Sequence, residues 1–244
     1  MADHHLLSLG RTRRLCMVLA TLLLGGTAQA LEVSPLRVEL GPGQPDAELW
    51  LYNDSAQPWT GQARLYAWDQ TTHEERLQPT AALAVSPAAL QVPAHARQRL
   101  RVVRLGPAPV AEQGYRLVLR AGAESPPVQV SLPVFVAGAV ASPAPALAVR
   151  LLDAGEPAVL ELYNGGARHA RLADLAWVAA NGQTRPILPG LAGYVLAGQT
   201  RRWVLPGTAE AYRDGRFSAR IGDQAAQLLD GLAPAIATGT PAGL

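Results

Sequence analysis

The chain has 244 residues, enough for two ordinary domains, and its charges nearly balance: 21 basic residues, all arginine, stand against 19 acidic ones. So even a balance gives no support for binding to nucleic acid or to an anionic membrane surface. A single cysteine excludes a disulfide framework, so the fold must be held together by its core.

Residues 1–30 have the organisation of a secretory signal peptide. Three arginines within residues 11–14 precede an apolar run over residues 15–25, and Ala28-Gln29-Ala30 supplies the small residues of a cleavage site. The apolar run is too short to span a bilayer, and no later stretch is long enough. Removing the signal takes away three arginines, Asp3 and the cysteine, which leaves 18 basic and 18 acidic residues. We therefore expect an exported, nearly neutral protein.

The first half of the mature chain consists of short segments in which apolar and polar residues alternate, separated by Pro, Gly and Asn. This spacing predicts strands and turns rather than helices. Strands are expected at residues 32–40, 47–52, 61–69, 83–92, 98–105, 115–120 and 128–136.

The last of these segments has a fully aliphatic face, made of Val128, Val130, Leu132, Val134 and Val136. Such a face is typical of a strand packed against the core of its own sandwich. Pro133 restricts the strand to a sheet edge or bulge, because proline has no N–H to donate. An apolar strand at an edge is also what a protein needs if it lends a strand to a partner. The pattern is compatible with both roles.

A segment rich in Ala, Gly and Pro, residues 139–146, predicts a linker. A second set of strands is expected at residues 148–152, 158–163, 168–179, 194–196, 199–205 and 217–221. Asn181-Gly182 is a strong hairpin-turn signal, suited to positive φ at both positions. Residues 237–244 lack any periodicity and are expected to be a disordered tail.

A five-residue segment of the first half recurs in similar form in the second half, and we call this pair of segments the echo. Leu49-Trp50-Leu51-Tyr52-Asn53 resembles Leu160-Glu161-Leu162-Tyr163-Asn164, which lies about one immunoglobulin-like domain further along the chain. We therefore predict an all-β protein of two tandem immunoglobulin-like β-sandwiches, with an N-terminal domain over residues 31–138 and a C-terminal domain over 147–236.

The usual catalytic patterns do not occur in the sequence. There is no nucleophile elbow, phosphate-binding loop, zinc-protease motif or dinucleotide-binding glycine pattern. The histidines of the mature chain, His73, His95 and His169, are far apart and are expected to be solvated surface residues. We expect no enzymatic activity, no metal and no cofactor.

The mature chain resembles the periplasmic pilus chaperones, the PapD-like family, and in particular their archaic branch. In the first domain the resemblance is carried by Val33-Ser34-Pro35-Leu36-Arg37-Val38, Tyr52-Asn53, Trp68, Val85-Ser86-Pro87, residues 99–104, Tyr115-Arg116-Leu117 and residues 132–136. In the second domain it is carried by residues 163–172 and 193–200. It covers almost the whole mature chain.

The resemblance implies two immunoglobulin-like domains arranged as a boomerang, or L, with a cleft between them. It also implies a function: to bind pilin subunits with an incomplete immunoglobulin-like fold in the periplasm and to deliver them to an outer-membrane usher. The segment 128–136 matches the family's donor strand, so Val128, Val130, Leu132 and Val134 are the expected subunit-binding side chains. The exposed edge also suggests self-association of the free protein.

The family has two cationic residues that bind a subunit carboxylate, and only one of them has a counterpart in this sequence. In the classical branch of the family an Arg on the first strand and a Lys on the donor strand bind the C-terminal carboxylate of the subunit. The Arg corresponds to Arg37, whose planar guanidinium suits a carboxylate. The Lys position is occupied by Pro133. Arg101 or Arg116 is a candidate for the second cation, and for Arg101 an outward-facing salt-bridge role is an equal alternative.

Three other functions compete with this interpretation. The first is an exported structural or adhesin component of a surface appendage, which would share the strands and the signal peptide. The second is a small-ligand binding protein with its site in the interdomain cleft, which would need more aromatic residues than the 5% present here. An enzyme is the third.

Overall fold

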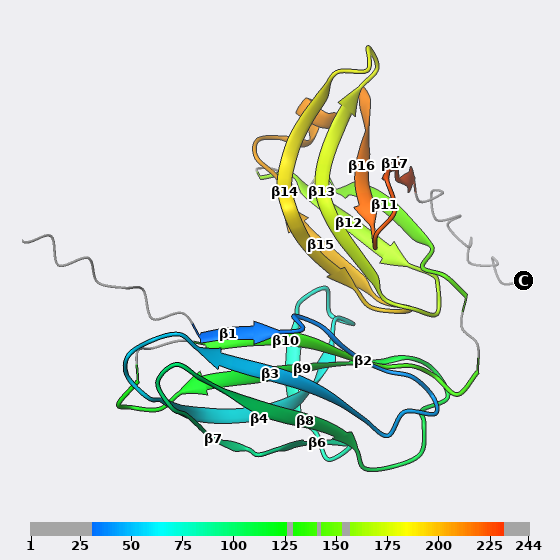
Figure 1. Cartoon of the computed structure of the whole chain (residues 1–244). Helices are drawn as coiled ribbons and strands as arrows, with labels where there is room; N and C mark the ends of the chain where they lie inside the picture. Colours follow the sequence, from blue (N-terminus) through cyan, green and yellow to red (C-terminus); the bar gives the residue numbers. More distant parts are fainter. Residues whose placement is uncertain (1–30, 126–128, 141–142, 153–156, 232–244) are drawn as a thin grey trace, which may run out of the picture.

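The computed structural model describes residues 31–125, 129–140, 143–152 and 157–231; the expected signal peptide and terminal tail lie outside these ranges. The described residues form two β-sandwiches arranged as the arms of an L (Figure 1). The predicted fold class is confirmed. None of the described segments is a helix long and apolar enough to cross a membrane.

The N-terminal sandwich contains β1 (Leu31–Ser34), β2 (Val38–Leu40), β3 (Asp46–Asn53), β4 (Trp59–Asp69), β5 (Arg76–Pro79), β6 (Leu83–Ser86), β7 (Ala89–Val92), β8 (Ala96–Arg104), β9 (Gln113–Ala121) and β10 (Gln129–Val136). One sheet has the order β1-β3-β8-β6, and we call it the first sheet. The other has the order β2-β10-β9-β4-β5, with β7 also paired to β4, and we call it the second sheet.

The single strand expected over residues 32–40 is in fact two strands. β1 pairs with β3 in the first sheet, whereas β2 pairs with β10 in the second. The chain crosses between the sheets at residues 35–37, where a bend interrupts the extended backbone. Alternation of apolar residues cannot reveal such a switch, because both parts face the same core.

The core of this domain comes from the inward faces of both sheets. Leu49, Leu51 and Leu100 of the first sheet and Leu117 and Leu119 of the second have no exposed surface. The residues between them in sequence point outward, as the period of two requires.

The C-terminal sandwich contains β11 (Leu147–Leu152), β12 (Val159–Asn164), β13 (Ala170–Ala179), β14 (Thr184–Val195), β15 (Thr200–Val204), β16 (Gly215–Ile221), β17 (Ala226–Leu228) and β18 (Asp230–Gly231), with a short 3-10 turn at Ala209–Tyr212. Its sheets have the orders β15-β12-β11-β18 and β14-β13-β16-β17.

The hairpin predicted at Asn181-Gly182 is confirmed as the turn between β13 and β14, with positive φ at Gly182 only. Strand β14 is much longer than the predicted 194–196. Its prolines and glycines resemble loop residues in sequence. They are tolerated here because β14 is an edge strand with irregular register.

The internal echo marks equivalent positions in the two domains. Asn53 ends β3 and its side-chain amide donates to the carbonyls of Gln57, Val92 and Pro93. Asn164 ends β12 and its amide donates to the carbonyls of Arg168 and Val195. Both side chains are buried, so each asparagine ties a turn to a neighbouring strand of its sandwich.

Candidate functional site

An aromatic cluster joins the two domains. Trp68 and Phe135 lie on the outer face of the second sheet and pack against Tyr194 and Leu196 of the C-terminal domain. The fully buried Gln70 adds two hydrogen bonds across the boundary: its Nε2 donates to the Tyr194 carbonyl (3.1 Å), and its Oε1 accepts from the Leu196 N–H (3.0 Å). These contacts fix the angle between the arms of the L.

His169 belongs to this boundary, and the expectation of a solvated surface residue was wrong for it. Its ring stacks on Phe135 with 3.4 Å between centroids and is only 7% exposed. Glu112 of the N-terminal domain lies 3.1 Å from its Nδ1 and accepts a hydrogen bond from its backbone N–H at 2.6 Å. No local sequence signal reveals this contact, because the partners come from different domains.

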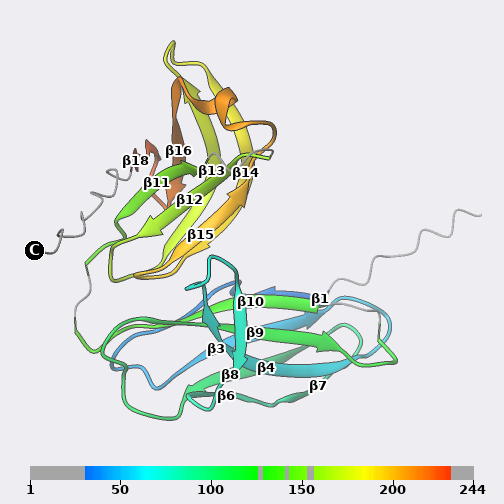
Figure 2. The same ribbon diagram turned by 180° about the vertical axis from the view of Figure 1, so that it is seen from behind.

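The tip of the β4–β5 hairpin rises beside β15 of the C-terminal domain (Figure 2). Its Glu75 pairs with Arg201 at 2.7 Å and with Arg116 at 3.5 Å. On the facing sheet, buried Glu161 accepts hydrogen bonds from Arg150 and Arg202. Burial would raise the pKa of Glu161, but these hydrogen bonds outweigh it and hold the pKa below its usual value.

Strand β10 presents an unpaired backbone edge next to this boundary. Along its whole length β10 pairs with β9. On its other side β2 pairs only with Val134, Phe135 and Val136. Within the described part of the chain, no strand covers the edge from Gln129 to Pro133.

The backbone groups on this edge follow from the alternation of the ladder. The N–H of Ala137 donates to the carbonyl of Leu40, so the odd-numbered residues turn their backbone groups towards β2. Gln129 and Ser131 therefore direct both N–H and C=O at the uncovered edge, whereas Pro133 has no N–H and its carbonyl faces the N–H of Val38 in the β2 ladder. A strand added here would find two donors and two acceptors.

The aliphatic side chains of β10 point into the protein's own core. Leu132 and Val134 are 4% and 0% exposed, and Val130 is half-buried and packs on the same cluster. Val128 lies outside the described residues. The structure thus brings Val130, Leu132 and Val134 together on the inner face of β10, beside the uncovered edge rather than out in solvent.

Arg37 lies where the uncovered edge ends. It directly precedes Val38, the partner of Val134, so it stands level with Pro133. Its side chain is 38% exposed and its Nε lies 2.8 Å from a Glu39 oxygen. The neighbouring Leu36 is 69% exposed. A half-exposed cation next to an unpaired strand edge is well placed to meet the end of an added strand.

The other candidate cations are placed differently. Arg101 lies on the outer face of the first sheet and binds both oxygens of Asp46, at 2.8 and 3.0 Å. This hydrogen bonding holds the pKa of Asp46 below its usual value. The structure therefore does not bring Arg101 to the β10 edge.

Arg116 lies directly across β10 from Arg37, because it pairs with Pro133. Its guanidinium stacks over Trp68 at 3.7 Å and its side chain is only 13% exposed. Burial lowers the pKa of Arg116, although Glu75 opposes that shift. It contacts the domain boundary and also borders the uncovered edge.

A cavity of about 480 Å³ lies beside the hinge and is lined by residues of both domains, among them Leu40, Glu112, Phe135 and Arg168. Phe135 is its only aromatic residue, which does not favour a small-ligand site. Among the described residues no group of three His, Cys, Asp or Glu side chains is placed to hold a metal ion.

Residues 30–133 match the family model described as "Pili and flagellar-assembly chaperone, PapD N-terminal domain". No curated protein sequence matches the chain significantly.

Solved structures resemble the chain over most of its length. One is a chain of the CsuC–CsuE chaperone–tip adhesion subunit pre-assembly complex from archaic chaperone-usher Csu pili of Acinetobacter baumannii, with a TM-score of 0.68, 18% identity, and coverage of 84% of this chain and 100% of that one. Another is a chain of the Salmonella enterica SafA pilin in complex with the SafB chaperone. Its TM-score is 0.58 at 18% identity, and the match covers 83% of this chain and 96% of that one. The Pseudomonas aeruginosa CupB2 chaperone matches with a TM-score of 0.55 at 15% identity, over 81% of this chain and 97% of that one. The chain therefore has a two-sandwich fold similar to that of these proteins, and its N-terminal domain also matches the PapD N-terminal domain family in sequence.

Proposed function

We propose that this protein is a periplasmic chaperone that binds pilus subunits by strand addition at the uncovered edge of β10 and delivers them to an outer-membrane usher. The observation that carries the proposal is this edge, from Gln129 to Pro133, which has unpaired backbone groups outside and an apolar face inside. The family match of the N-terminal domain supports it. So does the fold similarity to a chain of a complex between a chaperone and a pilin.

The physical basis is that the unpaired edge of β10 and the unpaired edge of the subunit become paired with each other. A subunit whose immunoglobulin-like fold lacks a strand exposes backbone groups and apolar core, and it would aggregate through them. A subunit strand beside β10 would pair with Gln129 and Ser131. Its inward side chains would extend the core formed by Val130 and Leu132, and each buried aliphatic side chain would contribute roughly 1.5–3 kcal/mol before ordering costs. No nucleotide is needed.

The orientation of the added strand determines what Arg37 meets. A strand parallel to β10 would run from Gln129 towards Pro133, and its C-terminal end would reach Arg37. A carboxylate there would replace Glu39 as the partner of the guanidinium. We include Arg37 in the proposed site for this reason, with Val128, Val130, Leu132 and Val134 as the apolar side. We do not extend the proposal to Arg101, which is already bound by Asp46.

Several further elements belong to the same proposal. Residues 1–30 would be removed on export to the periplasm, and residues 139–146 would link the two domains. The archaic branch, the usher as partner and self-association of the free protein through the β10 edge are also proposed.

Co-expression in the periplasm with the pilin-like protein encoded nearest this one tests the function. We expect a soluble one-to-one complex to co-purify on a tag carried by this chain, and we expect Arg37→Ala to weaken it. Because Arg37 is half-exposed and its ion pair with Glu39 is near the surface, the variant should fold normally. A pilin that stays equally soluble alone and never co-purifies would favour the structural-component alternative.

A further inference from the structure

Two arginines without acidic partners lie on the outer face of the second sheet, on the strands β9 and β4 that follow β10. The register places three rows of residues across β10, β9 and β4: Gln129–Arg120–Gln62, Ser131–Val118–Arg64 and Pro133–Arg116–Tyr66. All nine point outward, because the residues that alternate with them belong to the core. The three rows contain three arginines and no carboxylate.

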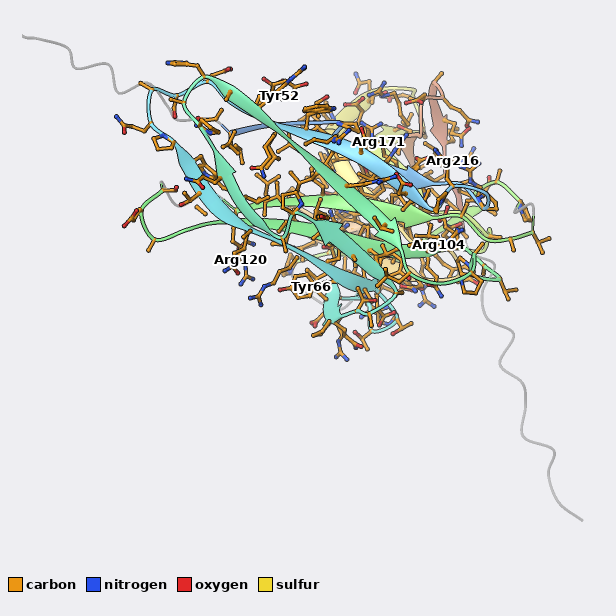
Figure 3. All side chains as sticks on the ribbon, turned by 60° about the horizontal axis from the view of Figure 1, so that its bottom comes forward. Tyr52, Tyr66, Arg104, Arg120, Arg171 and Arg216 are labelled. Carbon is orange, nitrogen blue, oxygen red and sulfur yellow. The ribbon has the colours of Figure 1, made fainter. Side chains whose placement is uncertain are left out.

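Arg64 and Arg120 are the two arginines of this face whose charge is not balanced by a nearby acidic side chain. Both are exposed, and neither forms an ion pair with any acid in the described chain. Arg64 donates only to Gln62, at 3.2 Å. Together with Tyr66 they cover the buried Val118 and line a shallow hollow of about 130 Å³. Arg120 and Tyr66 project from the same side of the sandwich, opposite Tyr52 of the first sheet (Figure 3).

The first sheet provides an internal comparison. Of its outward-facing arginines on β8, Arg99 and Arg101 are each paired with an acid of β3, Glu48 at 3.2 Å and Asp46 at 2.8 Å, and Arg97 stacks on Trp50. Two of the three outward-facing arginines of β8 thus have acidic partners, whereas in the three rows of the second sheet only Arg116 has one, Glu75 of the β4–β5 hairpin. The positive charge is concentrated on the face next to the edge where we propose that a strand is added.

We propose that this basic face, Arg64 and Arg120, selects partner segments with acidic side chains on the outer face of the added strand. The inference rests on the proposed strand addition. An added strand would lie roughly 10 Å from β9, which carries Arg120, and roughly 14 Å from β4, which carries Arg64, with the outward residues Gln129, Ser131 and Pro133 of β10 in between. The guanidinium groups need not touch the added strand, because charges at these distances steer association when the ionic strength is low.

Charge substitutions in the full mature chain test the proposal. The probe is the pilin-like protein encoded nearest this one, unfolded in urea and diluted into the chaperone at 20, 100 and 300 mM NaCl. We expect wild-type capture to slow several-fold as salt rises. Arg64→Gln/Arg120→Gln should capture about three- to tenfold more slowly at 20 mM NaCl and lose most of the salt dependence, and Arg64→Glu/Arg120→Glu should be slower still. Arg99→Gln, on the opposite sheet, is the matched control and should behave as the wild type.

Other outcomes would overturn the proposal. An unchanged rate and salt dependence in the Gln variant would show that the basic face does not meet the subunit. Faster capture by the Glu variant would show that the partner segment is basic. Loss of binding to phosphatidylglycerol vesicles with unchanged capture would assign the face to a membrane surface. If even the wild-type protein captures no subunit, the proposed function fails, and that result differs from a defect confined to the variants.

Discussion

At the residue scale, Glu161 shows how a buried carboxylate is stabilised beside the domain boundary. Its side chain is only 4% exposed, and its two oxygens accept from different arginines, Arg150 and Arg202. The N-terminal hairpin lies close to this network, because the Nδ1 of His73 is 3.9 Å from a Glu161 oxygen, although this is beyond hydrogen-bonding distance. A buried charge is tolerated here because both of its oxygens have charged partners.

We predict that Glu161→Gln lowers the free energy of unfolding by about 1–2 kcal/mol at pH 7, since an amide keeps only one acceptor oxygen. The folded-state pKa of Glu161 is depressed, so its contribution is fully present above the unfolded value near 4.3 and is lost as pH falls through the folded value. Urea unfolding between pH 7 and pH 3 should show the gap between variant and wild type closing at the acidic end. A gap that does not depend on pH would contradict this account. Glu124→Gln, at an exposed position, is the control.

His169 marks a limit of prediction at this scale. Its neighbours in sequence are polar or small, which is typical of a surface turn. The ring is buried only because the turn packs on Phe135 of the other domain. The buried asparagines of the echo, in contrast, were visible in sequence, because they recur at equivalent positions in two domains of the same type.

At the element scale, β10 shows what alternation can and cannot determine. The pattern of Val130, Leu132 and Val134 predicts a strand with one apolar face, and that is found. The pattern does not distinguish a face that packs on the protein's own core from one offered to a partner. That depends on which strand lies beside it, and β2 pairs with only three of its residues.

Leu132 therefore reports on folding as well as on binding. We predict that Leu132→Ala destabilises the N-terminal domain by about 2–5 kcal/mol, because the side chain is 4% exposed within the core. Ser131→Ala, at the exposed neighbouring position, should change the stability by no more than about 0.5 kcal/mol. Chemical denaturation measures both. Equal effects of the two substitutions would mean that Leu132 does not belong to the core.

At the scale of the whole molecule, contacts between single residues join the two domains. The sequence predicted two sandwiches but not the contacts that join them. Those contacts use single residues such as Gln70, whose partners lie more than 120 positions away. Local patterns carry no information on pairings of that length.

We predict that Gln70→Ala loosens the domain boundary, because the carbonyl of Tyr194 and the N–H of Leu196 each lose a buried partner, at a cost of about 1–3 kcal/mol per group. Small-angle X-ray scattering should show a larger radius of gyration, and thermal unfolding should separate into two transitions. Gln78→Ala, at an exposed position on β5, is the control. Unchanged scattering would show that the other contacts across the boundary hold the angle without Gln70.

The central claim is that a subunit strand pairs with the uncovered edge of β10, and Ser131 tests it most directly. Ser131→Pro removes an N–H that faces the edge, and it should cost no internal hydrogen bond, because Pro133 already occupies a position of the same parity. Ser131→Ala keeps that N–H.

With urea unfolding confirming that both variants fold, we would measure the dissociation constant of each for the pilin-like subunit. We predict that Ser131→Pro weakens binding about tenfold and that Ser131→Ala leaves it within about twofold. Equal affinity of the two variants would show that the subunit does not pair with this edge.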